Sequence, residues 1–415
     1  MRILFATIGS LGDLHPCLGL TLELKRRGHS VVIASTEAYR SRVLELGIGF
    51  RSLRPSWDPT DSELIRQCED LKSGPEILFR KLILPHLDET YLDLVTAASE
   101  CDFMLAGELA FAAPLVAEKL GLKWGSLILS PCSFLSAYDP SLLVNMPQLI
   151  RLRGAGWRLN RAILNLGTRF IESWWEPVRR LRVKEGLNPA CAPLTRDKFS
   201  STLVLALFSS ALAERQPDWP PQTVQTGFAF YDGSRPNAEL PALASFLAAG
   251  EAPIVFTLGS TAVSHPGNFY QASRDAVLRL GKRAVLIGAS DLEPRSDQIL
   301  SIPYAPYSEI FPTASVIVHQ GGSGTTGQAL RAGRPMLFVP FGWDQPDNAL
   351  RVERLGAGLT VARTAYSADT AFAKLDRLLR EPHFASRAAD LGAIVRSQHG
   401  IQEACDAVET AMHRS

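Results

Sequence analysis

The sequence predicts an α/β protein built from two doubly wound domains, each a parallel β-sheet with helices on both faces. Three observations lead to this fold class. The chain has 415 residues, which suits two domains at roughly 100–200 residues each. Its N-terminus shows a buried strand, a helix and a second buried strand in succession. The same alternation of short apolar strands and helix-length segments starts again in the second half.

The first strand–helix–strand unit lies at the N-terminus. Residues 2–8 are apolar with little alternation, as expected for a strand covered on both faces. Pro16 suits the first turn of the helix that follows, and Gly28 suits the residue just past its end. The next strand is predicted at residues 30–34. Together these elements form one parallel βαβ unit.

The second half repeats this pattern after two turn-rich segments. These segments, residues 216–222 and 232–236, place the domain boundary near residues 215–235. The strands predicted beyond it are residues 253–258, 283–287, 315–318 and 335–339. The expected domains are an N-terminal Rossmann-like domain at 1–220, a C-terminal Rossmann-like domain at 236–390, and a C-terminal helix at 391–415 that packs back on the N-terminal domain.

The composition indicates an ordinary globular protein. Hydrophobic residues make up 46%, charged residues 20%, and the formal net charge is +1, which argues against a disordered chain and against a nucleic-acid partner. The N-terminus enters a strand without a signal peptide, and no apolar run approaches the ~20 residues that span a bilayer, so we expect a cytoplasmic protein. Neither an Asp-x-Asp pair nor a His/Glu spacing suggests a bound metal.

Residues 149–185 differ from their surroundings because they are rich in arginine and tryptophan. The tryptophans are Trp157, Trp174 and Trp175, and the arginines are Arg151, Arg153, Arg158, Arg161, Arg169, Arg179, Arg180 and Arg182. A helical insertion that covers the first domain and walls a pocket would show this pattern. A basic amphipathic helix that lies on an anionic membrane would show it too. Peripheral membrane contact through this region is therefore the second interpretation.

The most informative segment is residues 315–330, where a buried strand breaks into a glycine-rich turn that opens a helix. Glycines let a ligand approach the backbone closely, and the N–H groups and dipole of a helix start attract anions. Ser323 and Thr325 add hydroxyl donors, and His319 or Gln320 at the strand end can reach a phosphate. The segment predicts an anion site; the alternative is a tight structural corner.

A second strand-to-helix turn follows at residues 340–349. Parallel strands end at the same edge of a sheet, so Asp344 and Gln345 are expected to project beside the glycine-rich turn. A carboxylate next to an amide suits vicinal hydroxyls, because one accepts and the other both donates and accepts. Alternatively, Asp344 simply caps the helix.

These segments resemble a known family. Tyr304 to Tyr307, His319 to Thr325 and Pro340 to Ala349 together strongly resemble the donor-binding signature of the family 1 glycosyltransferases of GT-B fold, in which two Rossmann-like domains face a cleft. The loop from Gly9 to Pro16 resembles that of the subgroup with the sterol glucosyltransferases and the rhamnolipid-type rhamnosyltransferases. The resemblance covers both halves of the chain in the right order.

The resemblance implies a role for each matching position. Tyr304 would stack on the base, Ser260 would help to hold the diphosphate, and Gln328 takes the place of a glutamate that commonly binds the ribose. Many relatives have a histidine directly before the two glycines, where this chain has Gln320, with His319 one residue earlier. The phosphate contact is thus assigned to either or both. The implied donor-binding residues are Gly12, Ser260, Tyr304, Tyr307, His319, Gln320, Gly322, Ser323, Gly324, Thr325, Gln328, Asp344 and Gln345.

The reaction also needs a base to deprotonate the acceptor hydroxyl. Asp13 in the first βα turn is our first assignment, because the subgroup has aspartate there, and His15 is the second. Helix capping is the structural alternative for Asp13. Family members with a histidine base orient it with a later acidic residue, and Glu108 stands near that position.

The resemblance implies an inverting, metal-independent glycosyltransferase without a cofactor. UDP-glucose is the default donor substrate, and the expected acceptor is a hydrophobic hydroxylated molecule or lipid. Aromatic residues of the first half fit such an acceptor, although core packing explains them equally well; they are Trp57, Phe79, Phe111, Phe134 and Trp157. Two rival functions are a nucleotide-sugar 2-epimerase on the same fold and a non-catalytic subunit that binds sugar nucleotides.

Overall fold

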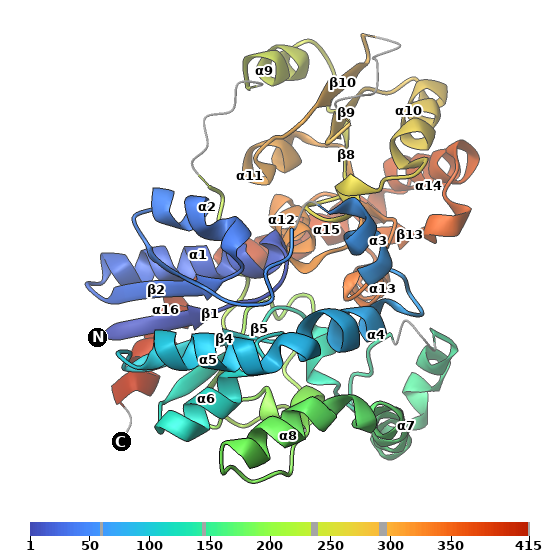
Figure 1. Cartoon of the computed structure of the whole chain (residues 1–415). Helices are drawn as coiled ribbons and strands as arrows, with labels where there is room; N and C mark the ends of the chain where they lie inside the picture. Colours follow the sequence, from blue (N-terminus) through green and yellow to red (C-terminus); the bar gives the residue numbers. More distant parts are fainter. Residues whose placement is uncertain (59–60, 143–146, 234–239, 290–296, 414–415) are drawn as a thin grey trace. The chain divides into compact units, whose positions relative to one another are not determined.

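The computed structural model describes residues 1–58, 61–142, 147–233, 240–289 and 297–413 (Figure 1). They form two compact units. The first unit comprises Met1–Pro59, Leu71–Tyr231 and His399–Ser415, and the second comprises Thr60–Asp70 and Asp232–Gln398. Each unit contains a parallel sheet with helices, which confirms the predicted fold class.

The first unit is built on a seven-stranded parallel sheet with the order β3-β2-β1-β4-β5-β6-β7. The strand order reverses between β1 and β4, and ligands of doubly wound sheets commonly bind at the carboxyl ends of the strands at such a switch point. In register, Ala6 at the end of β1 pairs with Ala106 of β4. The strands are β1 (Arg2–Ala6), β2 (Ser30–Ser35), β3 (Gly49–Ser52), β4 (Phe103–Gly107), β5 (Trp124–Ile128), β6 (Leu203–Ala206) and β7 (Thr223–Gln225).

The helix after β1 begins earlier than the sequence predicts. Ser10 is its N-cap, so Pro16 lies inside the helix and not in its first turn. Pro16 has no N–H to donate to the carbonyl of Gly12, four residues earlier. Because Gly12 is an exposed residue, the missing hydrogen bond costs less. Gly28 follows the helix with φ +90°, as predicted. The helices of this unit are α1 (Leu11–Arg26), α2 (Arg40–Glu45), α4 (Gly74–Glu76), α5 (Leu87–Ala98), α6 (Ala113–Leu120), α7 (Trp157–Phe170), α8 (Glu176–Lys184) and α16 (Gly400–His413).

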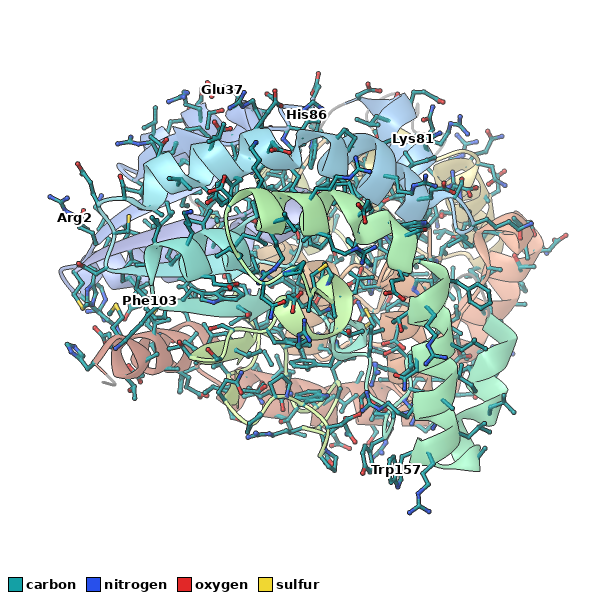
Figure 2. The ribbon with its side chains drawn as sticks, turned by 60° about the horizontal axis from the view of Figure 1, so that its bottom comes forward. Arg2, Glu37, Lys81, His86, Phe103 and Trp157 are labelled. Carbon is teal, nitrogen blue, oxygen red and sulfur yellow. The ribbon has the colours of Figure 1, made fainter. Side chains whose placement is uncertain are left out.

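Apolar side chains of the strands form the core of the first unit. Phe5, Ile33 and Phe103 are fully buried between the sheet and its helices. Figure 2 shows Phe103 within the unit, whereas the charged side chains of Arg2 and Glu37 lie at its surface. Strands β1, β4, β5 and β6 are buried on both faces along most of their length, as their apolar sequence predicts, whereas the edge strands β3 and β7 are partly exposed.

The second unit contains a six-stranded parallel sheet with the order β10-β9-β8-β11-β12-β13. Its order reverses between β8 and β11, which is the switch point of this sheet. All four strands predicted for this half are confirmed. The strands are β8 (Ile254–Thr257), β9 (Ala284–Ile287), β10 (Ile299–Ile302), β11 (Val316–His319), β12 (Met336–Phe338) and β13 (Gly358–Thr360).

The helices of the second unit include one from the N-terminal half of the sequence. That helix is α3, which lies between two parts of the chain that belong to the first unit. The helices are α3 (Ser62–Cys68), α9 (Leu240–Ala248), α10 (Phe269–Leu280), α11 (Tyr307–Ile310), α12 (Ser323–Ala332), α13 (Gln345–Arg354), α14 (Ala368–Arg380) and α15 (Pro382–Ser397).

The unit boundaries differ from the predicted domains at two places. Residues 60–70 belong to the second unit, because α3 packs there and Glu69 is buried in it. Residues 391–398 also belong to the second unit, since α15 packs on α12 and Gly392 lies directly against Gly333. Only His399–Ser415 joins the first unit, where Cys405 and Val408 of α16 enter the core.

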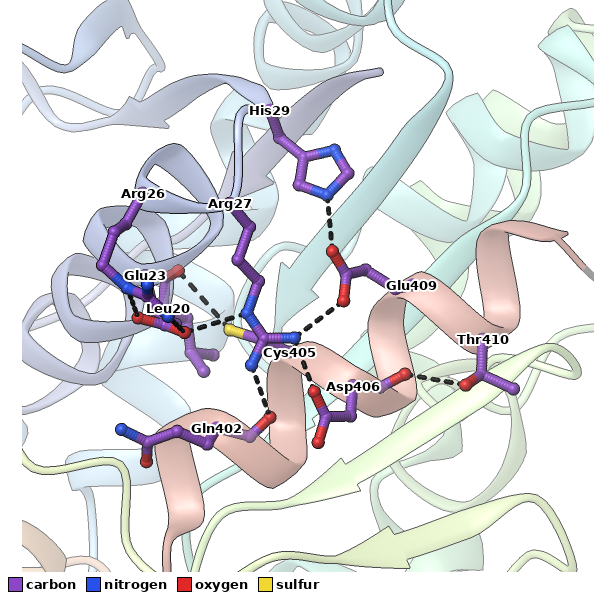
Figure 3. Close-up of polar contacts among 10 residues, drawn as sticks. All are labelled: Leu20, Glu23, Arg26, Arg27, His29, Gln402, Cys405, Asp406, Glu409 and Thr410. Carbon is purple, nitrogen blue, oxygen red and sulfur yellow. Dashed lines mark hydrogen bonds and ion pairs between the residues drawn. The ribbon is translucent and has the colours of Figure 1, made fainter.

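A cluster of charges fixes α16 to α1 in the first unit (Figure 3). The Arg27 guanidinium, just past the end of α1, donates to Glu23 of its own helix and to Asp406 and Glu409 of α16. His29 Nε2 lies 2.9 Å from the second oxygen of Glu409. One arginine therefore serves three carboxylates, and its side chain is only 17% exposed.

Replacing Arg27 by methionine is expected to lower the free energy of unfolding by about 2 kcal/mol, between the values for exposed and for buried ion pairs. The methionine keeps the apolar stem but leaves Asp406 and Glu409 without this cation. Urea unfolding measures the change. Arg26→Met is the matched control, because Arg26 is exposed and bonds only to Glu23 among the described residues. Equal losses in both variants would contradict the role of the cluster.

Candidate active site

The first predicted site residue, Asp13, lies where β1 passes into α1. Its Oδ2 accepts from the Ser10 N–H at 2.7 Å and from the Ser10 hydroxyl at 3.1 Å. This is the reciprocal half of a capping box, so Asp13 does help to cap the helix. Gly9 has φ +141°, and a Cβ there would collide with the Asp13 carboxylate. The turn is therefore shaped around this side chain.

The environment of Asp13 suits a base. Desolvation raises the pKa of its carboxyl to about 6, and the negative charge of Glu108 adds to the rise, while the Ser10 hydrogen bonds oppose it. The side chain is nevertheless partly exposed, so solvent or a substrate can reach it. A carboxylate with a pKa near 6 is ionised at neutral pH and takes up a proton more readily than an ordinary aspartate.

Glu108 follows β4, the neighbour of β1, and so stands at the same sheet edge as Asp13. Its Oε2 lies 3.2 Å from Lys198 Nζ, and the Lys198 side chain is only 7% exposed. Lys198 Nζ also donates to the Ser133 carbonyl. The sequence did not single out Lys198, because no motif marks a lysine so distant from Glu108 along the chain.

His15 lies on the same helix as Asp13 but faces other partners. Its Nε2 is 3.1 Å from the Arg42 guanidinium. Since arginine only donates, this nitrogen acts as the acceptor. The His15 ring lies 5.5 Å from that of Tyr231. The lone pair of His15 Nε2 is thus engaged by the Arg42 guanidinium.

The aromatic residues that the sequence offered for an acceptor divide into two groups. Phe111 packs edge to face on Phe79 and Trp175, and Phe134 stacks on Trp219 with the ring centroids 4.0 Å apart. Phe111 and Phe134 are buried in the core. A space of about 20 Å³ beside Glu108 and Lys198 holds roughly one water molecule. Trp157, in contrast, is 44% exposed at the start of α7.

The glycine-rich turn of the second unit joins β11 to α12. Gly321 has φ +99°, and Gly322 is the N-cap of α12 without a side-chain cap. A Cβ on Gly324 would meet nothing within 4 Å, so this face of the first helical turn is open. Thr325 is 8% exposed. The turn has the geometry of an anion site at a helix N-terminus.

His319 and Gln320 occupy different positions beside this turn. The His319 ring is completely buried against Phe338, and its Nδ1 accepts from the Gly321 N–H at 3.1 Å. Burial lowers the pKa of His319 to about 3, so the ring is neutral. The Gln320 amide lies over the turn instead, because Cβ atoms on Gly259 and Gly322 would both approach its Nε2. His319 therefore stabilises the backbone of the turn from its buried side.

Several buried polar atoms around the turn have no hydrogen-bond partner among the described residues. They are His319 Nε2, Gln320 Oε1, Thr326 Oγ1 and Gln328 Oε1. Buried polar groups are nearly always paired in folded proteins, so a group of orphans needs an explanation. A polar ligand at the turn would supply partners for those that border it.

The loop after β8 reaches the same sheet edge. Gly259 has φ +69°, and the exposed Ser260 follows it. The Tyr307 hydroxyl lies 2.7 Å from Thr257 Oγ1 of β8, and its ring stacks on Phe311. Tyr307 is thus committed to internal contacts, whereas Tyr304 is 47% exposed.

Gln328 on α12 is held by a neighbouring carboxylate. Its Nε2 donates to Asp232 Oδ1 at 2.8 Å, and Arg331 bonds to both oxygens of Asp232. A hollow of about 250 Å³ lies next to Gln328 and is bordered by Tyr307 and Arg331. It offers room for part of a nucleoside beside the predicted ribose contact.

The turn with Asp344 and Gln345 packs directly on the glycine-rich turn. Asn348 Nδ2 donates both to the Gly321 carbonyl and to Asp344 Oδ2. Asp344 is the N-cap of α13, yet its carboxylate makes no capping bond. Gln345 Oε1 accepts from two backbone N–H groups, those of residues 341 and 342. The predicted proximity of the two turns is confirmed.

Two features of this turn were not predicted. Asn348 is fully buried and connects both turns, although the sequence marked it only as part of a motif. Trp343 has φ +57°, which a bulky non-glycine residue rarely adopts. Such strain is typical of residues at functional sites. Backbone conformation of this kind has no signal in a single sequence.

The comparison with known proteins shows the family of the chain. Residues 3–126 match the glycosyltransferase family 28 N-terminal domain, and residues 287–410 match the erythromycin biosynthesis protein CIII-like C-terminal domain. The chain is 31% identical to O-mycaminosyltylonolide 6-deoxyallosyltransferase of Streptomyces fradiae, over 99% of this chain and 97% of that protein. It is 27% identical to a sterol 3-beta-glucosyltransferase of Pichia angusta, over 99% of this chain but only 33% of that protein.

Solved structures share the fold along the whole chain. Spinosyn forosaminyltransferase SpnP has a TM-score of 0.74 at 19% identity, and glycosyltransferase VinC in complex with dTDP has 0.69 at 20% identity; both cover 100% of each chain. Two units, each built on a parallel sheet with helices, define the class, a GT-B protein. The chain belongs to the glycosyltransferases, in the family of the macrolide and sterol sugar transferases.

Two further findings concern the described part of the chain. No helix there is long and apolar enough to cross a membrane. Within the same residues, no group of three or more His, Cys, Asp or Glu side chains could hold a metal ion.

Proposed function

We propose that this enzyme transfers a sugar from a nucleoside diphosphate to a hydroxyl group of a hydrophobic acceptor, with inversion at the anomeric carbon. The observation that carries the proposal is the start of α12, which no side chain caps and where the glycine-rich turn lies beside the amide nitrogen of Gln320. A diphosphate at this position would accept from the backbone N–H groups and from Gln320 Nε2. We assign the phosphate contact to Gln320, because its amide nitrogen lies over the turn, whereas His319 accepts from the Gly321 N–H and packs on Phe338.

The other donor contacts follow from the arrangement of the second unit. Ser323 and Thr325 border the turn with hydroxyl groups, and Ser260 approaches from the loop after β8. Asp344 and the Gln345 amide nitrogen would bind sugar hydroxyls, while Tyr304 and Gln328 would contact the base and the ribose. The negative charge of the leaving diphosphate would be stabilised by the N-terminus of α12.

The chemical step is a single displacement in this proposal. The acceptor oxygen forms a bond to the anomeric carbon as its proton passes to the Asp13 carboxylate. The bond between the anomeric carbon and the diphosphate oxygen breaks, and its electron pair leaves with the diphosphate. Attack opposite to the leaving group inverts the configuration.

A screen of donors and acceptors tests the proposal. The purified protein is incubated with UDP- and dTDP-linked sugars and with macrolide aglycones, sterols and phenols, and the products are identified by mass spectrometry. Both nucleotides are included because UDP-glucose is our default donor whereas one structural neighbour holds dTDP. Acceptor-dependent release of the nucleoside diphosphate with a new glycoside is the expected result. Turnover of UDP-GlcNAc without acceptor would instead reveal an epimerase, and binding without turnover a non-catalytic subunit.

We also propose that α7 contacts an anionic membrane surface. Its side chains Leu159, Leu166 and Phe170 are 44%, 56% and 73% exposed and recur at helical spacing along one stripe. Arg158 and Arg169 are exposed beside the stripe, and no acidic residue occurs in the helix. Figure 2 shows Trp157 projecting at one end of α7. An apolar stripe flanked by arginines suits the headgroup region of a bilayer.

Cosedimentation with vesicles tests this contact. Binding to vesicles with anionic lipid at low salt is expected, with at least about tenfold weaker binding for Leu166→Glu and Phe170→Glu, since each introduces a charge into the apolar stripe. Leu92→Glu is the matched control, because Leu92 is 57% exposed on α5. Binding that survives both substitutions in α7, or no binding of the wild type at low salt, would contradict the proposal.

A further inference from the structure

The segment that contains α3 brings a buried carboxylate into the second unit. Residues Thr60–Asp70 come from the N-terminal half of the sequence but pack in this unit. Glu69, the C-cap residue of α3, is only 3% exposed. A carboxylate is rarely buried unless hydrogen bonds or an ion pair compensate for the lost water.

The Glu69 carboxylate binds the loop that follows β8. Its Oε1 accepts from the Thr261 hydroxyl at 2.8 Å, and its Oε2 lies 2.9 Å from His265 Nε2. The His265 side chain is 8% exposed and packs edge to face on Phe341. Thr261 directly follows Ser260, which we place at the diphosphate. Glu69 therefore holds one of the two donor-binding loops.

The backbone of Glu69 contacts the other donor-binding loop. A Cβ on Gly342 would lie 2.9 Å from the Glu69 carbonyl oxygen and 3.1 Å from its Cα, so the two chains touch where Gly342 lacks a side chain. Gly342 precedes Asp344 by two residues, and its N–H donates to Gln345 Oε1. A single residue thus contacts the loop of Ser260 and the turn of Asp344.

A cationic side chain, Arg363, lies near the Glu69 carboxylate. The Arg363 guanidinium lies over the Phe341 ring at 4.0 Å and donates to the His265 carbonyl. Burial lowers the pKa of Arg363, and the negative charge of Glu69 opposes that effect. The carboxylate is thus surrounded by groups of the loops that it joins. Removing it would leave the Thr261 hydroxyl without this acceptor and the His265 ring without the carboxylate that faces it.

We propose that Glu69 is a positioning residue of the donor site, which fixes the Ser260 loop relative to the Asp344 turn. Ligands of an active site need neighbours that hold them in place to a fraction of an ångström. A nucleotide sugar needs the two loops in a fixed relation, because its diphosphate lies at the glycine-rich turn and the Ser260 loop and its sugar at the Asp344 turn. A nucleoside diphosphate makes only the first of these sets of contacts. The proposal rests on the donor site described under the proposed function.

Calorimetric titration of two ligands into the full-length protein tests this role. Glu69→Gln and Glu69→Ala are expected to weaken binding of the nucleotide sugar about tenfold, but that of the matching nucleoside diphosphate less than about threefold. The KM for the donor should rise in parallel, with little change in the KM for the acceptor. Glu63→Gln is the matched control, because Glu63 lies on the same helix but is exposed and pairs with Arg66 and Gln67.

The outcomes separate positioning from a purely structural role. A lower melting temperature with both affinities unchanged would overturn the proposal, and so would equal weakening of the two ligands. If Glu69→Asp, which keeps a carboxylate, retains part of the nucleotide-sugar affinity that Glu69→Ala loses, this result would support the proposal. If the wild type binds neither ligand, the proposed function itself fails and this inference falls with it.

Discussion

Asp13→Asn is expected to lower kcat about a thousandfold and to leave the protein at least as stable as the wild type. The amide cannot take the proton of the acceptor, and a positioned base typically contributes 10²- to 10⁴-fold. The asparagine still offers an oxygen to the Ser10 N–H, so the capping box is retained in part. Steady-state kinetics and thermal unfolding of the same preparation measure both effects.

The sign of the stability change follows from the direction of the pKa shift. The pKa of Asp13 is raised from 3.8 to about 6, so the folded protein favours the protonated form. The stability contributed by this group is full below the unfolded pKa of 3.8 and is lost as pH rises through 6. At neutral pH the ionised carboxylate therefore destabilises the fold, by at most about 3 kcal/mol, and its removal should raise the melting temperature.

The pH profile gives an independent check of the base. The wild-type kcat/KM should fall on the acid side with a midpoint near pH 6, as the Asp13 carboxylate becomes protonated. Glu108→Gln should move this midpoint to lower pH, because the charge of Glu108 helps to raise the pKa of Asp13. Near-normal turnover of Asp13→Asn together with inactive His15→Ala would show that the base is His15.

Asp344→Asn is expected to lower kcat/KM for the donor about a hundredfold. A carboxylate that accepts from sugar hydroxyls makes charge-assisted hydrogen bonds, which are about twice as strong as neutral ones. The substitution keeps an oxygen that can accept from Asn348 Nδ2, so the contact between the two turns is preserved. Kinetics with the donor identified in the screen measure the loss.

Binding of the free nucleoside diphosphate distinguishes a sugar contact from damage to the turn. The affinity of Asp344→Asn for this ligand should stay within about twofold of the wild type, because the glycine-rich turn is unchanged. Asn348→Ala provides the contrast, since it removes the bonds to both Gly321 and Asp344. An equal loss for nucleotide sugar and nucleoside diphosphate in Asp344→Asn would contradict a direct sugar contact.

The fold could be read from the sequence because its strands are apolar on both faces and end at glycine or polar residues. The strands at residues 254–257 and 316–319 were predicted within one or two residues for this reason. The position of α3 could not be predicted, because nothing in a short polar helix tells which of two sheets it packs against. The helix start predicted from Pro16 was too late, since proline also fits an interior position when the residue four positions earlier, here Gly12, is exposed.

The site was predictable where backbone chemistry determines it. Glycines 321 and 322 between a strand and a helix predict an anion site at the helix start, with a tight structural corner as the alternative. In contrast, the sequence could not separate His319 from Gln320, because alternation along a strand that ends in a turn does not fix which of the two side chains lies over the turn. Glu69 and Lys198 were missed altogether, since each acts on residues that only the tertiary structure brings close.

The course of the chain also sets rules for building hybrid enzymes. A donor-specificity module cut at Asp232 alone would lack residues 60–70, which pack in the second unit, and would retain residues 399–415, whose helix belongs to the core of the first. A hybrid with a single junction in the middle would thus combine segments of different origin within each unit: residues 60–70 in the second unit and residues 399–415 in the first. Exchanging the blocks 60–70 and 232–398 together keeps Glu69 with the loops that it contacts. Modular engineering of this protein therefore requires two inserts and not one.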